Sequence, residues 1–180
     1  KIKSEIDWEL IIVDNASTED IAKIANLECQ KCNILNKLKI YQQSKQGLTY
    51  ARKMGLQKAK YNFVLFVDDD NHIDEHYLQN TYELMSKNSS IGVLGGCGKL
   101  VFEDTVPTWL YRINIFANGP QEKKSGIVKN HLVYGAGFTI RKTAYFSLVN
   151  SGFTSLLDDR TGTVLSTGGD YELCYALKIG

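Results

Sequence analysis

Apolar runs alternate with amphipathic stretches along the first half of the chain. Short apolar runs rich in Val, Ile and Phe predict strands, and apolar residues recurring every three or four positions predict helices. The predicted strands are 8–13, 38–41 and 63–67, and the predicted helices are 21–32, 48–60 and 74–87. Strands that alternate with helices predict an α/β fold with a mostly parallel sheet flanked by helices.

Two polar signals mark the expected helix starts. Ser17, with Asp20 three residues later, predicts the start of the first helix, and Asp74 is expected to cap the third. Beyond Ser90 the pattern weakens. Strands are expected near 91–96, 99–102, 132–134 and 138–140, and a last helix over 170–178.

Composition limits the class of protein. The chain has 180 residues and 43% hydrophobic residues, which suits one packed domain. Lys plus Arg number 21 and Asp plus Glu 20, so the net charge of +1 predicts no nucleic-acid partner and no anionic membrane surface. No apolar run reaches the roughly 20 residues of a membrane span, so no span is expected in this chain.

The cysteines favour a reduced protein. Cys29 and Cys32 form a C-x-x-C pair, but a zinc site needs a second Cys or His pair at similar spacing, which is missing. The pair lies inside a helical pattern, so we expect it to pack within a helix. A reducing, cytoplasmic compartment fits this use of cysteine.

Three aspartates, Asp68 to Asp70, follow the apolar strand 63–67. Like charges this close raise one another's pKa, and a divalent cation removes that cost. Mg²⁺ and Mn²⁺ sites use one or two carboxylates and leave positions for water and phosphates. The alternative is that the acids only end a strand and open a turn.

A second strand also ends in an acid, because Asp14 follows Val13. Ligands of open α/β sheets bind outside the carboxyl ends of the strands. If the strands are parallel, Asp14 and Asp68 face one crevice. Asp14 on its own could equally start a turn.

Several phosphate and metal motifs are excluded. Gly98-Lys99 is followed by Leu100 where a phosphate loop needs a hydroxyl, and the glycine turns lack the third glycine of a dinucleotide fingerprint. His72 and Ile73 occupy positions where a calcium loop needs a ligand and a glycine. A Rossmann dehydrogenase is therefore disfavoured.

Four motifs occur in an informative order. They are Val13-Asp14-Asn15-Ala16-Ser17, Gly47 to Arg52, Asp68-Asp69-Asp70 and Gly169-Asp170. In this order and spacing the chain resembles family 2 glycosyltransferases of the GT-A fold. The resemblance implies a Rossmann-like nucleotide-diphospho-sugar transferase domain over 1–180, with a nucleotide-sugar-binding half at 1–90 and an acceptor-side half at 91–180.

The resemblance also implies a role for each site residue. Asp14 would bind the base of the donor nucleotide, and Arg52 would lie near that nucleotide. Asp70 would be the principal ligand of Mg²⁺ or Mn²⁺, and Asp68 would contact the ribose or support the metal. Asp170 would be the catalytic base that deprotonates the acceptor hydroxyl.

Simpler readings stay open for some of these residues. Asp170 follows two glycines and precedes a helix, so it could be only an N-cap. Arg52 could be an exposed helix arginine. Trp109, Tyr111 and Arg112 could stack on an acceptor sugar or belong to a core and flap.

Three departures from the family pattern are expected to matter. The family's first strand is missing, and Gly169 stands where an acid usually precedes the catalytic aspartate. The chain also stops at the expected catalytic helix. We therefore expect an excerpt of a longer enzyme, a truncated catalytic domain.

The sequence thus favours an inverting, metal-dependent glycosyltransferase. Its donor would be a UDP-, GDP- or dTDP-sugar and its acceptor a hydroxyl of a glycan or lipid-linked molecule, as in cell-surface polysaccharide biosynthesis. It would act in the cytoplasm or peripherally at the cytoplasmic membrane face. The alternatives are a haloacid-dehalogenase-like phosphohydrolase or phosphotransferase, and a non-catalytic sugar-nucleotide-binding domain.

Overall fold

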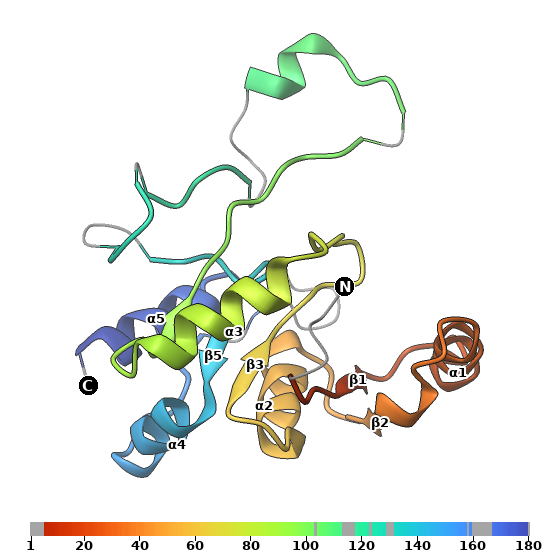
Figure 1. The fold of residues 1–180 in the computed structure, drawn as a ribbon, viewed down its shortest axis with the longest axis horizontal. Helices are drawn as coiled ribbons and strands as arrows, with labels where there is room; N and C mark the ends of the chain where they lie inside the picture. The colour runs from red at the N-terminus through yellow and green to blue at the C-terminus, as the bar shows by residue number, and fades with distance from the viewer. Residues whose placement is uncertain are drawn as a thin grey trace.

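A computed structural model describes residues 6–102, 104–112, 118–122, 124–128, 132–157, 159 and 167–179. In chain order the elements are β1 (Leu10–Asp14), α1 (Ile21–Lys31), η1 (Leu35–Lys37), β2 (Leu38–Gln42), α2 (Leu48–Lys58), β3 (Phe63–Leu65), α3 (Tyr77–Lys87), β4 (Val93–Leu94), η2 (Thr108–Arg112), β5 (Thr139–Arg141), α4 (Lys142–Asn150) and α5 (Gly169–Ile179). Figure 1 shows β3 and β5 at the centre of the body, with helices around them. The predicted α/β class is confirmed.

The described strands form two small sheets. β1 and β2 pair in parallel, whereas β5 lies between β3 and β4 and is antiparallel to both. The expectation of a mostly parallel sheet is therefore wrong for the described strands. The reason is that β5, from the second half of the chain, inserts between β3 and β4, which run in the same direction.

The main core joins this second sheet to helices from both halves of the chain. It consists of Leu56, Val133, Phe138, Ile140, Tyr145 and Cys174. Gly55 marks the side of α2 that packs on the strands, because a Cβ at this position would be in ordinary van der Waals contact with the Phe66 ring, at 3.7 Å, and with Val13, at 4.0 Å. α2 therefore lies against the ends of both β1 and the β3 segment, where the candidate acids follow.

α1 begins at Ile21 as expected, but Ser17 has no part in its start. Asp20 caps this helix and accepts a 3.0 Å hydrogen bond from the amide of Lys23. The amide of Ser17 instead donates to Asp14. Ser17 therefore belongs to the turn after β1, because its backbone bonds backwards along the chain.

The predicted cap of α3 is also wrong. Asp74 accepts a hydrogen bond from the amide of His76 and forms a turn. His76 is the N-cap residue, and the helix begins at Tyr77. The predicted strands at 99–102 and 132–134 are not strands, since the described pairing near the first is a single bridge between Gly98 and Gly119.

α4 is a helix that the sequence pattern did not predict. It follows β5 directly, and Arg141, in extended conformation, precedes it without a side-chain cap. No polar signal therefore marks its start. None of the helices in the described ranges is long and apolar enough to cross a membrane.

The cysteines are free thiols, and Cys29 and Cys174 are buried. The expectation that the C-x-x-C pair packs within a helix is confirmed for Cys29, which lies on the buried side of α1. Burial, aided by the nearby charge of Asp170, raises the pKa of Cys174 to about 12. That thiol is therefore uncharged near neutral pH.

Candidate active site

Asp14, the last residue of β1, forms a tight turn. Its Oδ1 accepts a 2.9 Å hydrogen bond from the amide of Ser17. Bonds from the amide and hydroxyl of Ser17 lower the pKa of the Asp14 carboxyl. Ala16 adopts a left-handed conformation, with φ of 57°, as the chain reverses. The turn-forming reading of Asp14 is confirmed, and its contact with a nucleotide base stays a prediction.

Asn15 fastens the loop before α2 to the end of β1. Its Nδ2 donates to the carbonyls of Gln43, at 3.0 Å, and Lys45, at 2.7 Å. Its Oδ1 accepts from the amide of Gly47 at 2.7 Å. Gly47, with φ of 136°, begins α2 in a conformation that favours glycine. Sequence reasoning did not single out the side chain of Asn15.

The three aspartates after β3 lie in different environments. Asp68 is half-buried, whereas Asp69 and Asp70 are exposed. Burial raises the pKa of the Asp68 carboxyl, and the Arg52 guanidinium opposes that rise. The charges of Asp70, Asp69 and Asp170 reinforce it. Charged residues of α2 and of the start of α5 therefore act electrostatically on Asp68.

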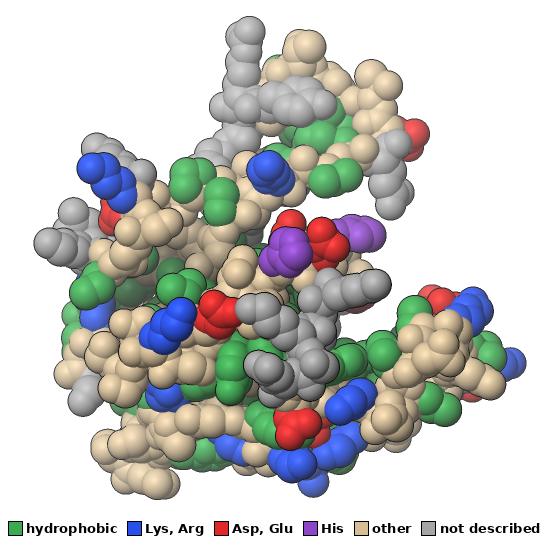
Figure 2. All heavy atoms as spheres, viewed as in Figure 1, with side chains coloured by type: hydrophobic (Ala, Val, Ile, Leu, Met, Phe, Trp, Pro, Cys, Tyr) green, Lys and Arg blue, Asp and Glu red, His purple; other side chains and the backbone are tan. Residues whose placement is uncertain are grey.

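Acids and histidines gather on the surface below the projecting segment that contains η2 (Figure 1 and Figure 2). His72 and His76 are exposed there, close in sequence to Asp70. No group of three or more His, Cys, Asp or Glu side chains in the described part of the chain is placed to hold a metal by itself. Any ion here would need ligands from a substrate or water.

Arg52 is not an exposed helix arginine. Its Nη1 donates to Oδ2 of Asp159 at 3.0 Å, and both side chains are mostly buried. The guanidinium also lies 5.2 Å from the centre of the Phe138 ring. Arg52 therefore points inward, toward the segment that contains the last predicted site residue.

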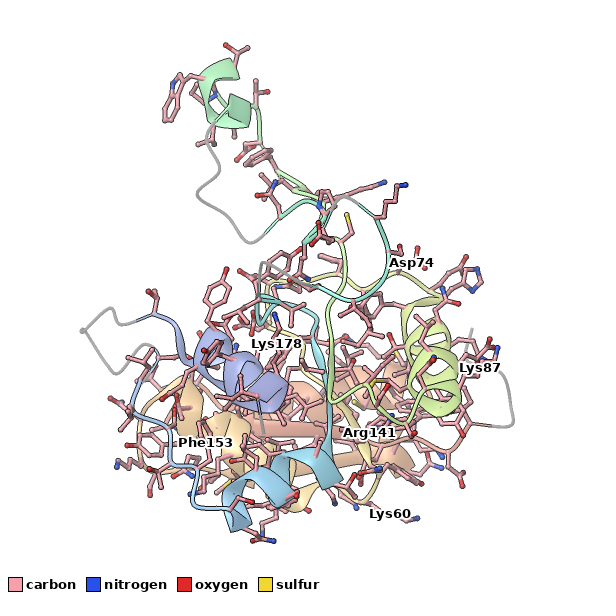
Figure 3. All side chains as sticks on the ribbon, turned by 90° about the vertical axis from the view of Figure 1, so that its left-hand side faces the viewer. Lys60, Asp74, Lys87, Arg141, Phe153 and Lys178 are labelled. Atoms are coloured by element: carbon pink, nitrogen blue, oxygen red, sulfur yellow. The ribbon has the colours of Figure 1, made fainter. Side chains whose placement is uncertain are left out.

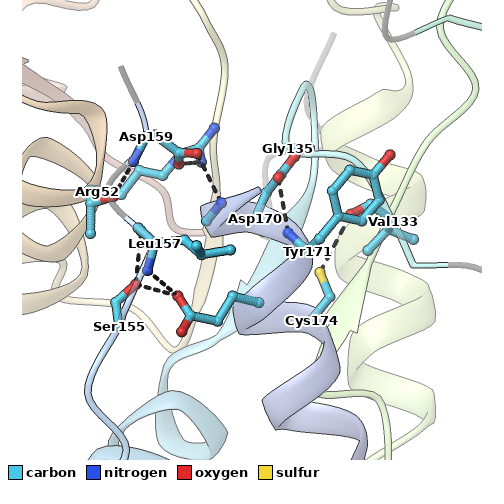
Figure 4. A network of polar contacts seen from close by, with 12 residues as sticks. Arg52, Val133, Gly135, Ser155, Leu157, Asp159, Asp170, Tyr171 and Cys174 are labelled. Atoms are coloured by element: carbon cyan, nitrogen blue, oxygen red, sulfur yellow. Dashed lines mark hydrogen bonds and ion pairs between the residues drawn. The ribbon is translucent and has the colours of Figure 1, made fainter. Parts of the chain in front are cut away.

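Asp170 lies in the first turn of α5, which begins at Gly169, so Asp170 is not the residue that caps the helix. Its Oδ2 accepts a 2.6 Å bond from the amide of Gly135, and its Oδ1 accepts from the amide of Tyr171 at 2.9 Å (Figure 4). Both carboxylate oxygens are held by backbone amides. The carboxylate therefore has a defined orientation.

A cavity of about 260 Å³ adjoins this group. Leu56, Tyr145 and Leu173, from α2, α4 and α5, supply apolar wall, and Arg52 and Asp170 also line it. α2, which contains the buried arginine, and α5, which contains the predicted base, thus both line the cavity.

The structure brings together Arg52, Asp68 and Asp170, which come from three distant parts of the sequence. Asp70 lies at the exposed edge of this group. No hydrogen bond among the described residues joins Asp14 to it. Trp109 is 57% exposed on η2, while the side chains of Tyr111 and Arg112 lie outside the described residues.

Sequence reasoning missed two members of the site. Asp159 lies in a stretch without apolar periodicity, so no local signal marks it. Gly135 belongs to the glycine turn that failed as a dinucleotide motif, and its amide holds Asp170. Both act through contacts with residues far along the chain.

Comparison with known proteins gives the family. A family model described as Glycosyl transferase family 2 matches residues 2–146. The chain is 28% identical over 87 residues to Glycosyltransferase GlyG of Streptococcus pneumoniae serotype 4, covering 48% of this chain and 28% of that protein. It is 30% identical over 95 residues to a chondroitin synthase of Escherichia coli, covering 52% of this chain and 13% of that protein.

The match to the Poly(ribitol-phosphate) beta-N-acetylglucosaminyltransferase TarS of Staphylococcus aureus takes in more of this chain. It has 26% identity over 139 residues, which is 71% of this chain and 24% of TarS. The chain thus spans less than a third of the length of each of these relatives. Since the family match takes in well over half of the 180 residues, the chain belongs to glycosyl transferase family 2.

Proposed function

We propose that this chain is the part of an inverting glycosyltransferase that binds a nucleotide sugar and transfers its sugar to a hydroxyl of a glycan or lipid-linked acceptor. One observation carries the proposal. Arg52, Asp68 and Asp170 lie within electrostatic reach of one another, although they come from α2, the segment after β3 and the start of α5. A cationic group and two separated carboxylates suit a reaction between an anionic donor and a neutral hydroxyl.

Asp170 is the proposed base. Inverting transfer needs the acceptor hydroxyl to lose its proton as it attacks the anomeric carbon, and an oriented carboxylate can take that proton. The amides of Gly135 and Tyr171 orient the Asp170 carboxylate at 2.6 and 2.9 Å. The family match ends before Asp170, so its geometry, rather than the match, supports this role.

Asp68 and Asp70 are the proposed ligands of Mg²⁺ or Mn²⁺. Two carboxylates fit a cation that takes its remaining ligands from diphosphate and water. The raised pKa of Asp68 among like charges also fits, since a cation there would favour the ionised carboxylates. When bound, such a cation stabilises the charge that develops on the leaving nucleoside diphosphate.

The nucleotide would lie toward β1 in the proposed nucleotide-sugar half, 1–90. Asp14 would bind its nucleobase, and Arg52 would lie near its phosphates. The acceptor would approach from the half at 91–180. UDP-, GDP- and dTDP-sugars are the candidate donors. UDP-N-acetylglucosamine is the first to test, because the name of the TarS relative specifies N-acetylglucosaminyl transfer. A cytoplasmic location, or one at the cytoplasmic membrane face, and a part in cell-surface polysaccharide synthesis belong to this proposal.

Isothermal titration with UDP-, GDP- and dTDP-sugars, with and without Mn²⁺, tests the donor site. At least one nucleotide sugar should bind in a Mn²⁺-dependent way. Asp70→Ala should weaken that binding at least about tenfold, as expected for loss of a charged ligand. Asp69→Ala is the matched control, because Asp69 is an equally exposed neighbour without a proposed role. Equal effects of the two variants, or no binding with metal, would contradict the proposal.

Family membership argues against the phosphotransferase alternative. The non-catalytic alternative predicts donor binding without turnover. Slow release of the sugar to water in the absence of an acceptor separates the two, because only a competent site activates the leaving group. Absence of this hydrolysis, together with absence of transfer, would favour a binding domain.

A further inference from the structure

The carboxylate of Asp159 occupies the space that a side chain at position 169 would need. A Cβ placed on Gly169 would lie 2.6 Å from Oδ2 and 2.9 Å from Cγ of Asp159. Asp159 is only 7% exposed, and moving its carboxylate aside would break its bonds to Gly169 and Arg52. Glycine at 169 and an acid at 159 therefore depend on each other.

Asp159 also connects two helices. Its Oδ1 accepts a 2.9 Å bond from the amide of Gly169, at the start of α5. Its Oδ2 accepts from Nη1 of Arg52 at 3.0 Å, and its own amide donates to the hydroxyl of Thr49 at 3.2 Å. Both Thr49 and Arg52 belong to α2. Figure 4 shows Asp159 and Arg52 joined beside the start of α5, near Asp170.

Arg52 and Asp170 both lie beside Gly135. A Cβ on Gly135 would lie 2.6 Å from Nη2 of Arg52 and 3.1 Å from Oδ2 of Asp170. The Arg52 guanidinium and the Asp170 carboxylate therefore lie on the same side of Gly135. The amide of Gly135 donates to Asp170. Because Asp159 holds both Arg52 and the residue directly before Asp170, it controls the charge and the backbone beside that carboxylate.

We propose that Asp159 is a positioning residue for Asp170, and that it acts by holding both Arg52 and the backbone at the start of α5. The inference rests on the proposed role of Asp170 as base. An ionised carboxylate at the first amides of a helix bonds well to them and also compensates a buried guanidinium. Position 169 can then be glycine without leaving Arg52 and the start of α5 without an anionic partner.

A structural readout tests the inference without any substrate. In the full chain labelled with ¹⁵N-glycine, Asp159→Asn should shift the amide resonance of Gly169, which loses a charged acceptor. It should also shift that of Gly135, whose amide donates to Asp170. Asp20→Asn, which changes the cap of α1, is the matched control and should move neither. An unmoved Gly135 resonance in Asp159→Asn would overturn the inference.

A kinetic readout uses Mn²⁺ and UDP-N-acetylglucosamine, or whichever UDP-, GDP- or dTDP-sugar binds the wild-type chain. Asp159→Asn should lower kcat for sugar release by roughly tenfold to a hundredfold, the cost of misplacing a reacting group, while KM for the donor stays within about twofold. A merely structural role would lower the folded fraction and leave kcat per folded molecule unchanged, which would overturn the inference.

A relocation of the acid makes the test sharper. Gly169→Glu alone should be impaired by collision with Asp159, and Asp159→Ala alone by loss of the acid. The double variant should recover at least about tenfold over the two effects combined, because the pair is coupled. Additive losses would overturn the inference. If no nucleotide sugar binds the wild type, the proposed function fails, while the glycine resonances still decide the role of Asp159.

Discussion

Neighbouring carboxylates at the start of α5 have different partners and therefore different tasks. Asp170 is held by the amide of Gly135 on the side of the candidate site. Glu172, two residues later, faces the incoming loop. It accepts bonds from the amides of Leu156, at 2.8 Å, and Leu157, at 3.0 Å. The first carboxylate is the proposed base, and the second holds the loop to the helix.

Glu172→Gln is predicted to destabilise the fold in a pH-dependent way. Burial opposes ionisation of Glu172, but hydrogen bonds from the loop outweigh it and lower the pKa. The stabilisation is therefore present above the unfolded value of 4.5 and is lost as pH falls through the folded pKa. At pH 7 the melting temperature should fall by about 2–4 °C, the effect of roughly 1 kcal/mol.

Thermal unfolding followed by circular dichroism between pH 3 and 8 measures this effect. The difference between wild type and Glu172→Gln should shrink toward the acid end. Glu19→Gln, at an exposed position, is the control and should change little. A difference that stays constant down to the lowest pH would contradict the role of the charge.

Asp170→Asn is predicted to abolish transfer while sparing donor binding. The variant keeps the shape of the side chain and one of its two bonds to backbone amides, because the NH2 group of Asn cannot accept a hydrogen bond. It cannot take a proton, so transfer should fall by about 10²–10⁴-fold. Titration with the donor and Mn²⁺ should give an affinity within about twofold of wild type. Asp7→Asn, at an exposed aspartate near the N-terminus, serves as control. Joint loss of binding and transfer would argue against Asp170 as the base.

Single residues of the site were partly predictable. Asp14, Asp68 and Asp70 follow apolar strands, so a local pattern marks them. Arg52 and Asp170, whose charges act on Asp68, lie far along the chain, and no local pattern relates them to it. Asp159 could not be predicted, because two of its partners, Arg52 and Thr49, are more than 100 residues away in α2.

At the scale of elements, the loop before α2 depends on the end of β1. Asn15 makes three hydrogen bonds to this loop, and one of them fixes the amide of Gly47 just before the helix. One side chain thus fastens the loop before α2 to the end of β1. This contact also places Arg52, one turn into α2, relative to Asp14.

Asn15→Ala should therefore cost about 2 kcal/mol, since several bonds are lost and a part-buried amide loses its partner. The melting temperature should drop by roughly 4–8 °C. Asn26→Ala is the matched control, because Asn26 makes one exposed bond, to the carbonyl of Ala22, and alanine favours the helix. Similar losses in both variants, measured by thermal unfolding, would contradict the role of Asn15 in holding the loop before α2.

Elements with their own periodic pattern were predicted well. α1 and α2 begin within a residue of the expected positions, because an amphipathic face is a local property. Strand pairing is different. The predicted strands at 99–102 and 132–134 have apolar residues but are not paired as strands, and α4 has no capping signal. Pairing depends on a partner that the segment itself does not encode.

For the whole molecule, Arg141 connects β5 to the C-terminal end of α3. Its Nε donates to the carbonyl of Ile91 at 2.8 Å, and its Nη2 donates to the carbonyls of Met85 and Asn88 at 2.7 and 2.8 Å. Figure 3 shows Arg141 on the side of the body where α3 ends. The guanidinium also lies 4.9 Å from the centre of the Phe63 ring. One side chain thus joins β3, α3, β5 and the segment before β4.

Arg141→Lys is predicted to destabilise the domain by about 2–3 kcal/mol, because an ammonium cannot reach three separate carbonyls in the fixed geometry of a guanidinium. The midpoint of urea unfolding should shift with little change in slope. Lys87→Met removes an exposed pair with Glu83 at 3.7 Å and should cost less than about 0.5 kcal/mol. An equally small effect of Arg141→Lys would contradict the connecting role.

By itself, the sequence determined the α/β class, the family and the acids that end two strands, because each is written in short, contiguous patterns. Only the tertiary structure decided that β5 inserts between β3 and β4, that Arg52 points inward, and that Asp159 fills the space above Gly169. These features depend on contacts between distant segments. Which side chain meets which is settled by packing and burial of charge, and no local pattern encodes that outcome.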